Sequence, residues 1–126
     1  MKKTFQTTID SLDIEKIDKL VLSTYEWNLS EPYEPKKITF ESADKELIEK
    51  WINLLKKMEL KERDEESLFG GFGYYLYFYN GDETTEISSI MLPNIYGKTK
   101  RMLSVENYLE LYSEFTALEK AMGLEE

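Results

Sequence analysis

Hydrophobic side chains recur at helical spacing in two stretches of the chain, and each stretch predicts an amphipathic helix. The first helix follows Ser42, a good N-cap, and is predicted to run to about Glu59. Its apolar stripe consists of Leu47, Ile48, Trp51, Ile52, Leu54, Leu55 and Met58. The second helix follows Ser104 and ends at Gly123, a residue suited to the left-handed position after a helix. Its stripe consists of Tyr108, Leu111, Tyr112, Phe115, Leu118 and Met122.

An aromatic run from Phe69 to Asn80 predicts a long β-strand that enters a tight hairpin at Asn80-Gly81. Side chains alternate between the two faces of a strand, so the run has one apolar face and one tyrosine-rich face. The apolar face carries Phe72, Tyr74, Leu76 and Phe78, and the other face carries Gly73, Tyr75, Tyr77 and Tyr79.

The stretch Glu83 to Leu92 is predicted to be the antiparallel partner of this strand. A two-residue loop would place Tyr77 opposite Thr84 and Tyr75 opposite Glu86, and would place Tyr79 opposite Asp82 and Tyr74 opposite Ile87. Glu86 is then expected to lie beside the tyrosines, with Ile87 on the core face. A three-residue loop with a bulge would shift these partners.

Shorter signals predict the remaining segments. A strand is expected from about Ile17 to Trp27, with a turn or short strand before it. Residues 28–35 are predicted to be a loop because two prolines disfavour both a helix and a central strand. A short strand is expected over Lys36 to Phe40, a charged connector over Leu60 to Ser67, and another strand over Ile95 to Val105.

These elements predict an α+β fold: an antiparallel sheet of four to five strands with two amphipathic helices packed on one face. The length of 126 residues predicts a single domain over 1–126, large enough to bury a core without disulfides. In this arrangement the second face of the sheet points toward solvent or a partner. That face carries the tyrosines.

The absence of both cysteine and histidine narrows the chemistry. It excludes disulfides, thiol chemistry, Ser-His-Asp triads and the usual zinc or copper sites. A calcium-type site of carboxylates stays open, but the two acidic clusters, in 62–66 and 82–86, lack the spacing of a calcium loop. We therefore expect no metal, no cofactor and no enzymatic activity.

The net charge of −9 argues against nucleic-acid binding, which needs clustered basic residues, and suits a basic protein partner. Positive charge gathers at Lys98, Lys100 and Arg101, which could contact an anion or an acidic partner, although a solvated turn is the better explanation of this cluster. The neighbouring Gly97-Lys98-Thr99 lacks the glycine that a phosphate-binding loop requires. No stretch is long and apolar enough to span a membrane, so the expected location is the cytoplasm.

Tyr75, Tyr77, Tyr79 and Glu86 are the candidate binding residues. Tyrosine offers a large, stiff contact area with a polar tip, and it is enriched in binding hot spots. Tyrosine is also simply a good strand residue, and another part of the chain could cover this face.

The sequence therefore predicts a small acidic domain that binds or inhibits another protein without catalysis. Three alternatives stay open: a small-ligand binder with an aromatic pocket between sheet and helices, a carboxylate-dependent enzyme, and a homodimer formed through the tyrosine face or a hairpin edge.

Overall fold

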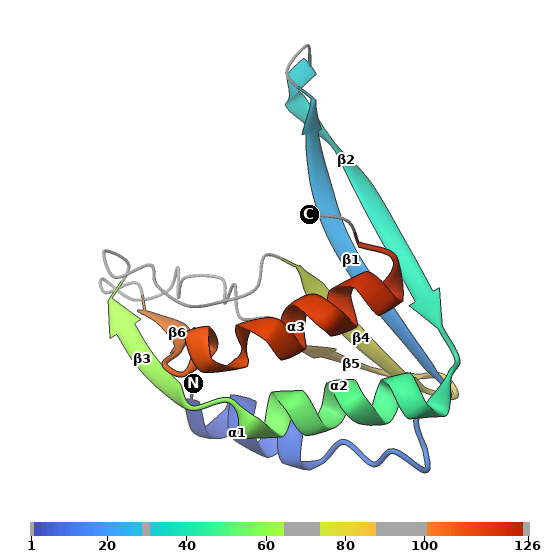
Figure 1. The fold of residues 1–126 in the computed structure, drawn as a ribbon, viewed down its shortest axis with the longest axis vertical. Helices are drawn as coiled ribbons and strands as arrows, with labels where there is room; N and C mark the ends of the chain where they lie inside the picture. Colours follow the sequence, from blue (N-terminus) through green and yellow to red (C-terminus); the bar gives the residue numbers. More distant parts are fainter. Residues whose placement is uncertain (1, 29–30, 65–73, 88–100, 125–126) are drawn as a thin grey trace.

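The computed structural model describes residues 2–28, 31–64, 74–87 and 101–124. In chain order, its elements are α1 (Lys2–Asp10), β1 (Lys19–Asn28), β2 (Glu31–Ser42), α2 (Lys45–Lys57), β3 (Leu60–Asp64), β4 (Tyr75–Asn80), β5 (Glu83–Ile87), β6 (Arg101–Val105) and α3 (Tyr108–Met122). A four-stranded antiparallel sheet has the order β2-β1-β4-β5. The helices lie on one side of it (Figure 1). The predicted α+β class is confirmed.

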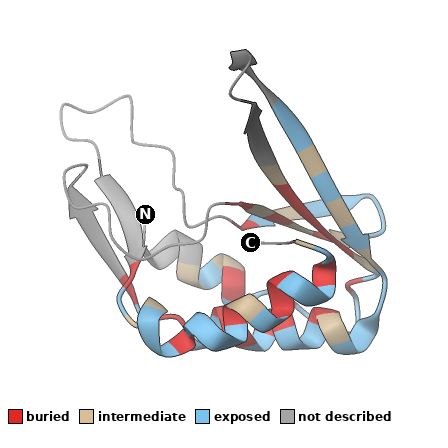
Figure 2. Cartoon of the chain, turned by 45° about the horizontal axis from the view of Figure 1, so that its top comes forward, coloured by how far each residue is buried: buried red, intermediate tan, exposed pale blue. Residues whose placement is uncertain are grey.

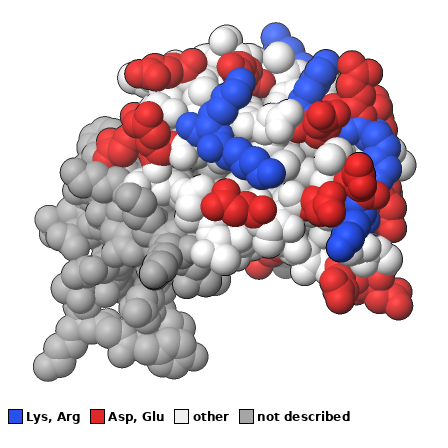
Figure 3. Space-filling model, turned by 90° about the horizontal axis from the view of Figure 1, so that it is seen from below, with Lys and Arg blue, Asp and Glu red and all other residues white. Residues whose placement is uncertain are grey.

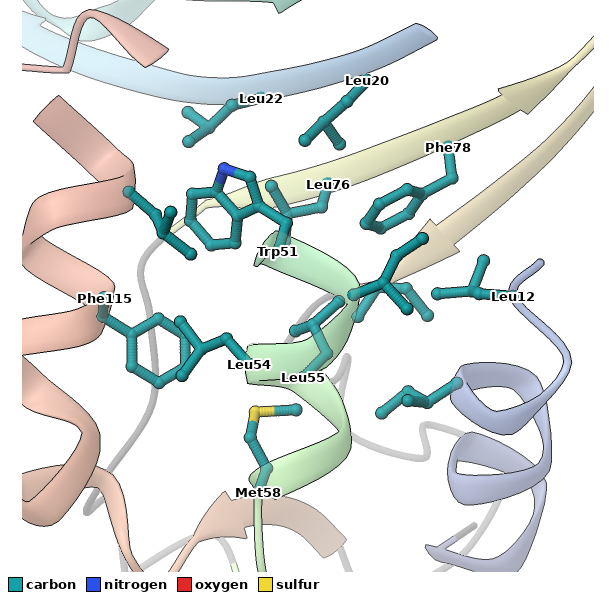
Figure 4. Close-up of a cluster of buried hydrophobic side chains, with 14 of the residues drawn as sticks. Leu12, Leu20, Leu22, Trp51, Leu54, Leu55, Met58, Leu76, Phe78 and Phe115 are labelled. Carbon is teal, nitrogen blue, oxygen red and sulfur yellow. The ribbon is translucent and has the colours of Figure 1, made fainter. Parts of the chain in front are cut away.

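A single cluster of buried side chains joins the sheet to the helices. The red segments in Figure 2 mark these buried residues on the strands and helices that form the core. Trp51 of α2 lies at the centre of Figure 4, with Leu22 and Leu76 on the sheet side and Phe115 on α3. Trp51, Phe115 and Phe78 are at most 1% exposed, so their rings are enclosed by the protein's own side chains. The predicted stripes of both helices therefore form the core, although Tyr112 at the edge of the α3 stripe is 48% exposed.

The start of α2 corrects the predicted N-cap by two residues. Asp44 is the cap, and its carboxylate accepts a hydrogen bond from the backbone N–H of Glu46 at 3.0 Å. Ser42 supports the cap residue, because its hydroxyl oxygen accepts from the backbone N–H of Asp44 at 3.2 Å. Serine and aspartate are both common at a helix N-cap, because each has a short side chain whose oxygen accepts a hydrogen bond from a backbone N–H that has no partner within the helix.

The N-terminal segment was predicted to be a turn or short strand, and it is instead the helix α1. Ile9 is fully buried and Leu12 is 6% exposed, and both belong to the core cluster. The connection to β1 is held by Lys45, whose ammonium group donates to the backbone oxygens of Ile14, Glu15 and Ile17. The helix was missed because tertiary packing of a few apolar residues, rather than intrinsic propensity, holds it in place.

The prediction of a loop over 28–35 is wrong for most of its length. The strand expected over Ile17 to Trp27 is observed as β1, and β2 begins at Glu31 and includes both prolines. β2 is an edge strand, and its register with β1 shifts between the pairs Glu26↔Lys36 and Asn28↔Glu31. Proline is tolerated at edges and irregular pairings, where its missing N–H removes no ladder hydrogen bond.

The β4–β5 hairpin is confirmed with a register that differs from the predicted one by two residues. Asn80 pairs with Glu83 and Tyr77 with Glu86, so the loop is Gly81-Asp82 rather than Asn80-Gly81. Gly81 has a φ of 59°, and no other described residue except Gly123 has a positive φ. This combination fits a type II′ turn, which needs glycine at its first central position only. A shift of two residues leaves every side chain on its predicted face.

Two further strand predictions need correction. Leu60 to Ser67 was predicted to be a connector, but Leu60–Asp64 forms β3. β3 pairs with β6, the described part of the strand predicted over 95–105, so β6 belongs to a separate two-stranded sheet. The sequence of β3 is mostly charged and has no strand pattern of its own. It forms a strand because it pairs with β6, which is far away along the chain. Residues 69–73 and 88–100, which complete the predicted strands, lie outside the described residues.

Asn107 links the end of α2 to the start of α3. Its amide group donates to the backbone oxygen of Lys57 and its side-chain oxygen accepts from the N–H of Glu59, both at 2.9 Å. The last carbonyls of a helix lack hydrogen-bond partners within the helix, and the Asn107 amide is the donor to one of these carbonyls, that of Lys57. It occupies the N-cap position of α3 that was predicted for Ser104, and its side chain makes no cap bond to α3.

Gly123→Ala is expected to lower the free energy of unfolding by about 1–2 kcal/mol or more. Gly123 ends α3 in the predicted left-handed conformation, with a φ of 108°. An added Cβ would also lie 3.0 Å from the Phe40 ring of β2. Urea unfolding would measure the change, and a Gly123→Asn variant separates the two causes, since asparagine tolerates the left-handed region but keeps the steric conflict. Wild-type stability of the alanine variant would contradict this account.

Candidate functional site

The sheet face opposite the three helices carries the predicted tyrosines. We call this surface the tyrosine face, and it is defined by the outward-pointing residues that the strand registers align. Its members are Lys19, Val21 and Ser23 on β1, Thr39 and Glu41 on β2, Tyr75, Tyr77 and Tyr79 on β4, and Thr84 and Glu86 on β5. Leu76 and Phe78, which alternate with the tyrosines, are at most 1% exposed on the core side. The predicted division of this strand into two faces is observed.

The three tyrosines are partly buried and adjacent. The rings of Tyr75 and Tyr77 stack with their centroids 6.5 Å apart and their planes 23° apart. The Tyr77 hydroxyl donates to the Glu86 carboxylate at 3.3 Å, as the expected position of Glu86 beside the tyrosines suggested. Lys19 places its ammonium nitrogen 4.5 Å from the centre of the Tyr79 ring. Each ring is therefore held by a neighbour on the same face.

Two short side chains of β1 lie between the tyrosines of β4 and the residues of β2. Val21 and Ser23 point to the tyrosine face, yet they are only 7% and 2% exposed. Each pairs with β4 on one side and β2 on the other, so longer side chains flank them. The more exposed side chains of the face therefore surround two buried ones, Val21 and Ser23.

A row of residues crosses the whole sheet at Tyr77. The registers place Glu41, Val21, Tyr77 and Glu86 side by side on β2, β1, β4 and β5. Adjacent strands are about 4.8 Å apart, so Glu41 lies about 10 Å from Tyr77 on one side and Glu86 about 5 Å on the other. The row has a carboxylate at each end, with Val21 and Tyr77 between them. Sequence reasoning missed Glu41, because only the β1–β2 and β1–β4 registers bring it there.

The predicted basic contact residues cannot be compared with this surface. Lys98 and Lys100 lie outside the described residues, as does the side chain of Arg101 at the start of β6. In the described segments, no group of three acidic side chains is arranged to hold a metal ion.

Two surface hollows lie on the helical side. One, of about 440 Å³, is lined by residues of α2 and the turn after α1, including Asp13 and Glu49. The other, of about 410 Å³, lies between α2 and α3, with Leu54 and Leu118 among its lining residues. The Lys57 ammonium and the Glu114 carboxylate, 3.1 Å apart, join its two walls. Both hollows differ from the aromatic pocket expected between sheet and helices, where Trp51 and Phe115 are fully buried.

The helical side has no large area of a single charge in the view that Figure 3 gives. Seen from below, lysine side chains are interspersed with aspartate and glutamate. Such a surface does not single out one class of charged partner. It therefore offers less basis for recognition than the tyrosine face.

None of the protein-family models, curated proteins or solved structures with which the chain was compared matches it. Across the part of the chain that the structure describes, no helix combines the length and apolar character needed to cross a membrane.

Proposed function

We propose that this chain is a non-catalytic domain that binds another protein through its tyrosine face. The observation that carries the proposal is the row of three partly buried tyrosines on the sheet face opposite the helices. Tyrosine contributes large contact area at a small cost in side-chain entropy, since few torsions must be fixed on binding. An aromatic cluster of this kind is typical of the centre of a protein interface.

The geometry of the face supports rapid and specific docking. Tyr75 and Tyr77 already stack, and the Glu86 carboxylate holds the Tyr77 hydroxyl. A preorganised surface loses less conformational freedom when a partner binds. The strand that carries the tyrosines also packs on the core through Leu76 and Phe78, and this packing helps to hold the binding residues in position.

We further propose that the partner is basic and that the chain neutralises it, as an inhibitor or immunity-type protein does. The net charge of −9 supports this, because it attracts a basic partner and speeds association. The absence of cysteine fits a reducing compartment such as the cytoplasm. If the partner is a second copy of the chain, the same face forms a homodimer.

A pull-down from the native cell lysate, read by mass spectrometry, tests the proposal. The bait is the wild-type chain, and the test variant replaces Tyr75, Tyr77 and Tyr79 by serine. The matched control is Tyr112→Ser, which removes a 48% exposed tyrosine from α3 instead. Circular dichroism establishes that both variants stay folded, and sedimentation reports self-association of each.

A protein retained by wild type and by Tyr112→Ser, and lost from the triple variant, is the expected result. Dimerisation that the triple variant alone abolishes supports the same surface with a second copy as partner. Equal retention by all three baits, or no retention together with a monomer in every case, contradicts the proposal. Equal retention would point to the acidic C-terminal helix as the binding surface, and no retention would favour the small-ligand and carboxylate-enzyme hypotheses.

A further inference from the structure

We infer that the open edge of β5 binds an extended, basic segment of the partner protein, which pairs with β5 and adds a strand to the sheet. This inference rests on the proposed function and names a second contact of the same partner, next to the tyrosine face. Three features carry it: the outward-pointing backbone groups of β5, the acidic charge of this strand and its turn, and the unsuitable sequence of the opposite edge.

β5 lies at one edge of the four-stranded sheet, and among the described strands it pairs with β4 alone. In a hairpin with a two-residue loop, the pair that flanks the loop is hydrogen-bonded, and bonded and non-bonded pairs then alternate along the strands. Asn80 and Glu83 flank the loop, so the N–H and C=O groups of Thr84 and Glu86 point away from β4. Both residues are exposed. Such an edge offers donors and acceptors to another strand.

The turn before β5 and β5 itself carry acidic charge only. Residues 81–87 include Asp82, Glu83 and Glu86 and contain no lysine or arginine. All three acidic residues are exposed. Opposite charges on neighbouring strands form stabilising pairs, and like charges directly opposite each other are destabilising. A segment with basic side chains therefore fits this edge.

The same charge disfavours a second copy of the chain as the occupant. Two β5 strands side by side would bring Asp82, Glu83 and Glu86 of both copies together, and their carboxylates would repel. Charged side chains commonly protect edge strands from pairing with an identical strand. A basic segment of another protein gains from the charges that a second copy would suffer from.

β2, at the opposite edge of the sheet, is less suited to this pairing. It contains Pro32 and Pro35, which have no backbone N–H to donate. Lys36 and Lys37 follow, both exposed, and their charge repels a basic segment. β5 contains neither proline nor lysine. Of these two edges, β5 is therefore the one that suits a basic strand.

A strand paired with β5 would extend the tyrosine face. Thr84 and Glu86 belong to that face, and adjacent strands lie about 4.8 Å apart. In antiparallel pairing, the residues opposite Thr84 and Glu86 point their backbone N–H groups toward β5 and their side chains to the same face, where a basic side chain meets Glu86. Backbone hydrogen bonds supply affinity in this mode of recognition, and alternate side chains supply specificity.

The test is a titration of the ¹⁵N-labelled full chain followed by NMR. The probe is the capped peptide Ac-Lys-Val-Lys-Val-Lys-NH₂, and a counterpart with glutamine in place of lysine shows the contribution of charge. We expect saturable shifts with the lysine peptide that are largest at the amides of Thr84 and Glu86. Hydrogen exchange of these two amides should slow in the complex, and the glutamine peptide should bind more weakly.

Backbone methylation of the peptide distinguishes strand pairing from attraction between charges. Antiparallel pairing directs the N–H groups of the lysines toward β5, so methylation of the lysine backbone nitrogens should abolish saturable binding. Methylation of the valine backbone nitrogens alters the far edge of the peptide and should preserve binding. Equal binding of the two methylated peptides would overturn the inference, because both keep the charge of the parent.

Variants of the chain test the same contact. Thr84→Pro removes one outward N–H without removing a bond to β4, so it should weaken binding of the lysine peptide about fivefold or more, whereas Thr84→Ala should bind as wild type does. Glu83→Gln/Glu86→Gln should weaken binding more than Glu49→Gln/Glu59→Gln, which removes the same charge from exposed positions outside the sheet. Wild-type binding by a folded Thr84→Pro, or equal weakening by both double variants, would overturn the inference. The methylated peptides decide the question if Thr84→Pro does not fold.

The outcomes separate this inference from the proposed function. A partner that is lost from the triple tyrosine variant but binds Thr84→Pro with wild-type affinity overturns the inference alone, since the face then binds a protein without strand pairing at β5. Strand pairing of the lysine peptide at β5 without any partner in the pull-down would support this edge as a binding site and contradict the proposed function.

Discussion

Trp51→Ala is expected to lower the free energy of unfolding by about 3–5 kcal/mol, because it removes the largest side chain of the core. Trp51 is fully buried in α2. Its ring meets Tyr74 and Phe115 edge to face, at centroid distances of 6.1 Å and 6.4 Å. The variant therefore loses contacts with the sheet and with α3 together, and it leaves a cavity between them.

Equilibrium urea unfolding would measure this loss, with Leu109→Ala as the control. Leu109 lies on α3 and is 88% exposed, so its truncation should change stability by no more than about 0.5 kcal/mol. A Trp51→Phe variant should cost much less than Trp51→Ala. The indole N–H of Trp51 has no hydrogen-bond partner among the described residues, and phenylalanine removes this buried donor. Similar losses for Trp51→Ala and Leu109→Ala would contradict the central place of Trp51 in the core.

Tyr74→Phe is expected to cost about 2–3 kcal/mol, well above the usual effect of losing one hydroxyl. Its hydroxyl donates to the Glu119 carboxylate at 2.7 Å, and the two residues are 4% and 3% exposed. A buried carboxylate depends on its hydrogen bonds, because its water has been removed. Without the tyrosine hydroxyl, Glu119 loses a donor in a place that water cannot readily enter.

A double-mutant cycle with Glu119→Gln isolates the contribution of the charge. Glutamine keeps an acceptor for Tyr74, so Tyr74→Phe should cost only about 1 kcal/mol in that background. The control is Tyr79→Phe, on a partly buried tyrosine, which should be nearly neutral. Additive losses within about 0.5 kcal/mol would show that the two side chains do not depend on each other.

The sequence predicted those parts of the fold that local patterns determine. The stripe around Trp51 has a helical period that only a buried helix face explains, and the alternation through Tyr75 to Tyr79 fixes two strand faces. The left-handed turn at Gly123 follows from the conformational freedom of glycine. These features depend on neighbours within a few positions, and the structure bears them out.

The parts that the sequence did not predict depend on distant partners. β3 is charged and short, and it is a strand because β6 pairs with it. α1 is polar for most of its length, and among the side chains described in and just after it, Ile9 and Leu12 belong to the core. The two-residue change in the hairpin register follows from a type II′ turn at Gly81, which the Asn80-Gly81 pair did not indicate.

The residues of the candidate site also divide into those that local sequence predicts and one that depends on a distant strand. The tyrosines and Glu86 could be predicted, because they lie on one hairpin. Glu41 could not, because β2 reaches this row only through β1. Knowledge of the strand order would have been enough to find it, since the registers then follow from the hydrophobic alternation.

The strand order also determines how the chain must fold. β1 with β2, and β4 with β5, are hairpins whose strands are close in sequence, so each can form early. The pairing of β1 with β4 joins Val21 to Tyr77 and closes a loop that contains β2, α2 and β3. Closing such a loop costs chain entropy before its contacts form, so this step should limit the folding rate. The central pair of strands that positions the tyrosines is thus the last part of the sheet to assemble.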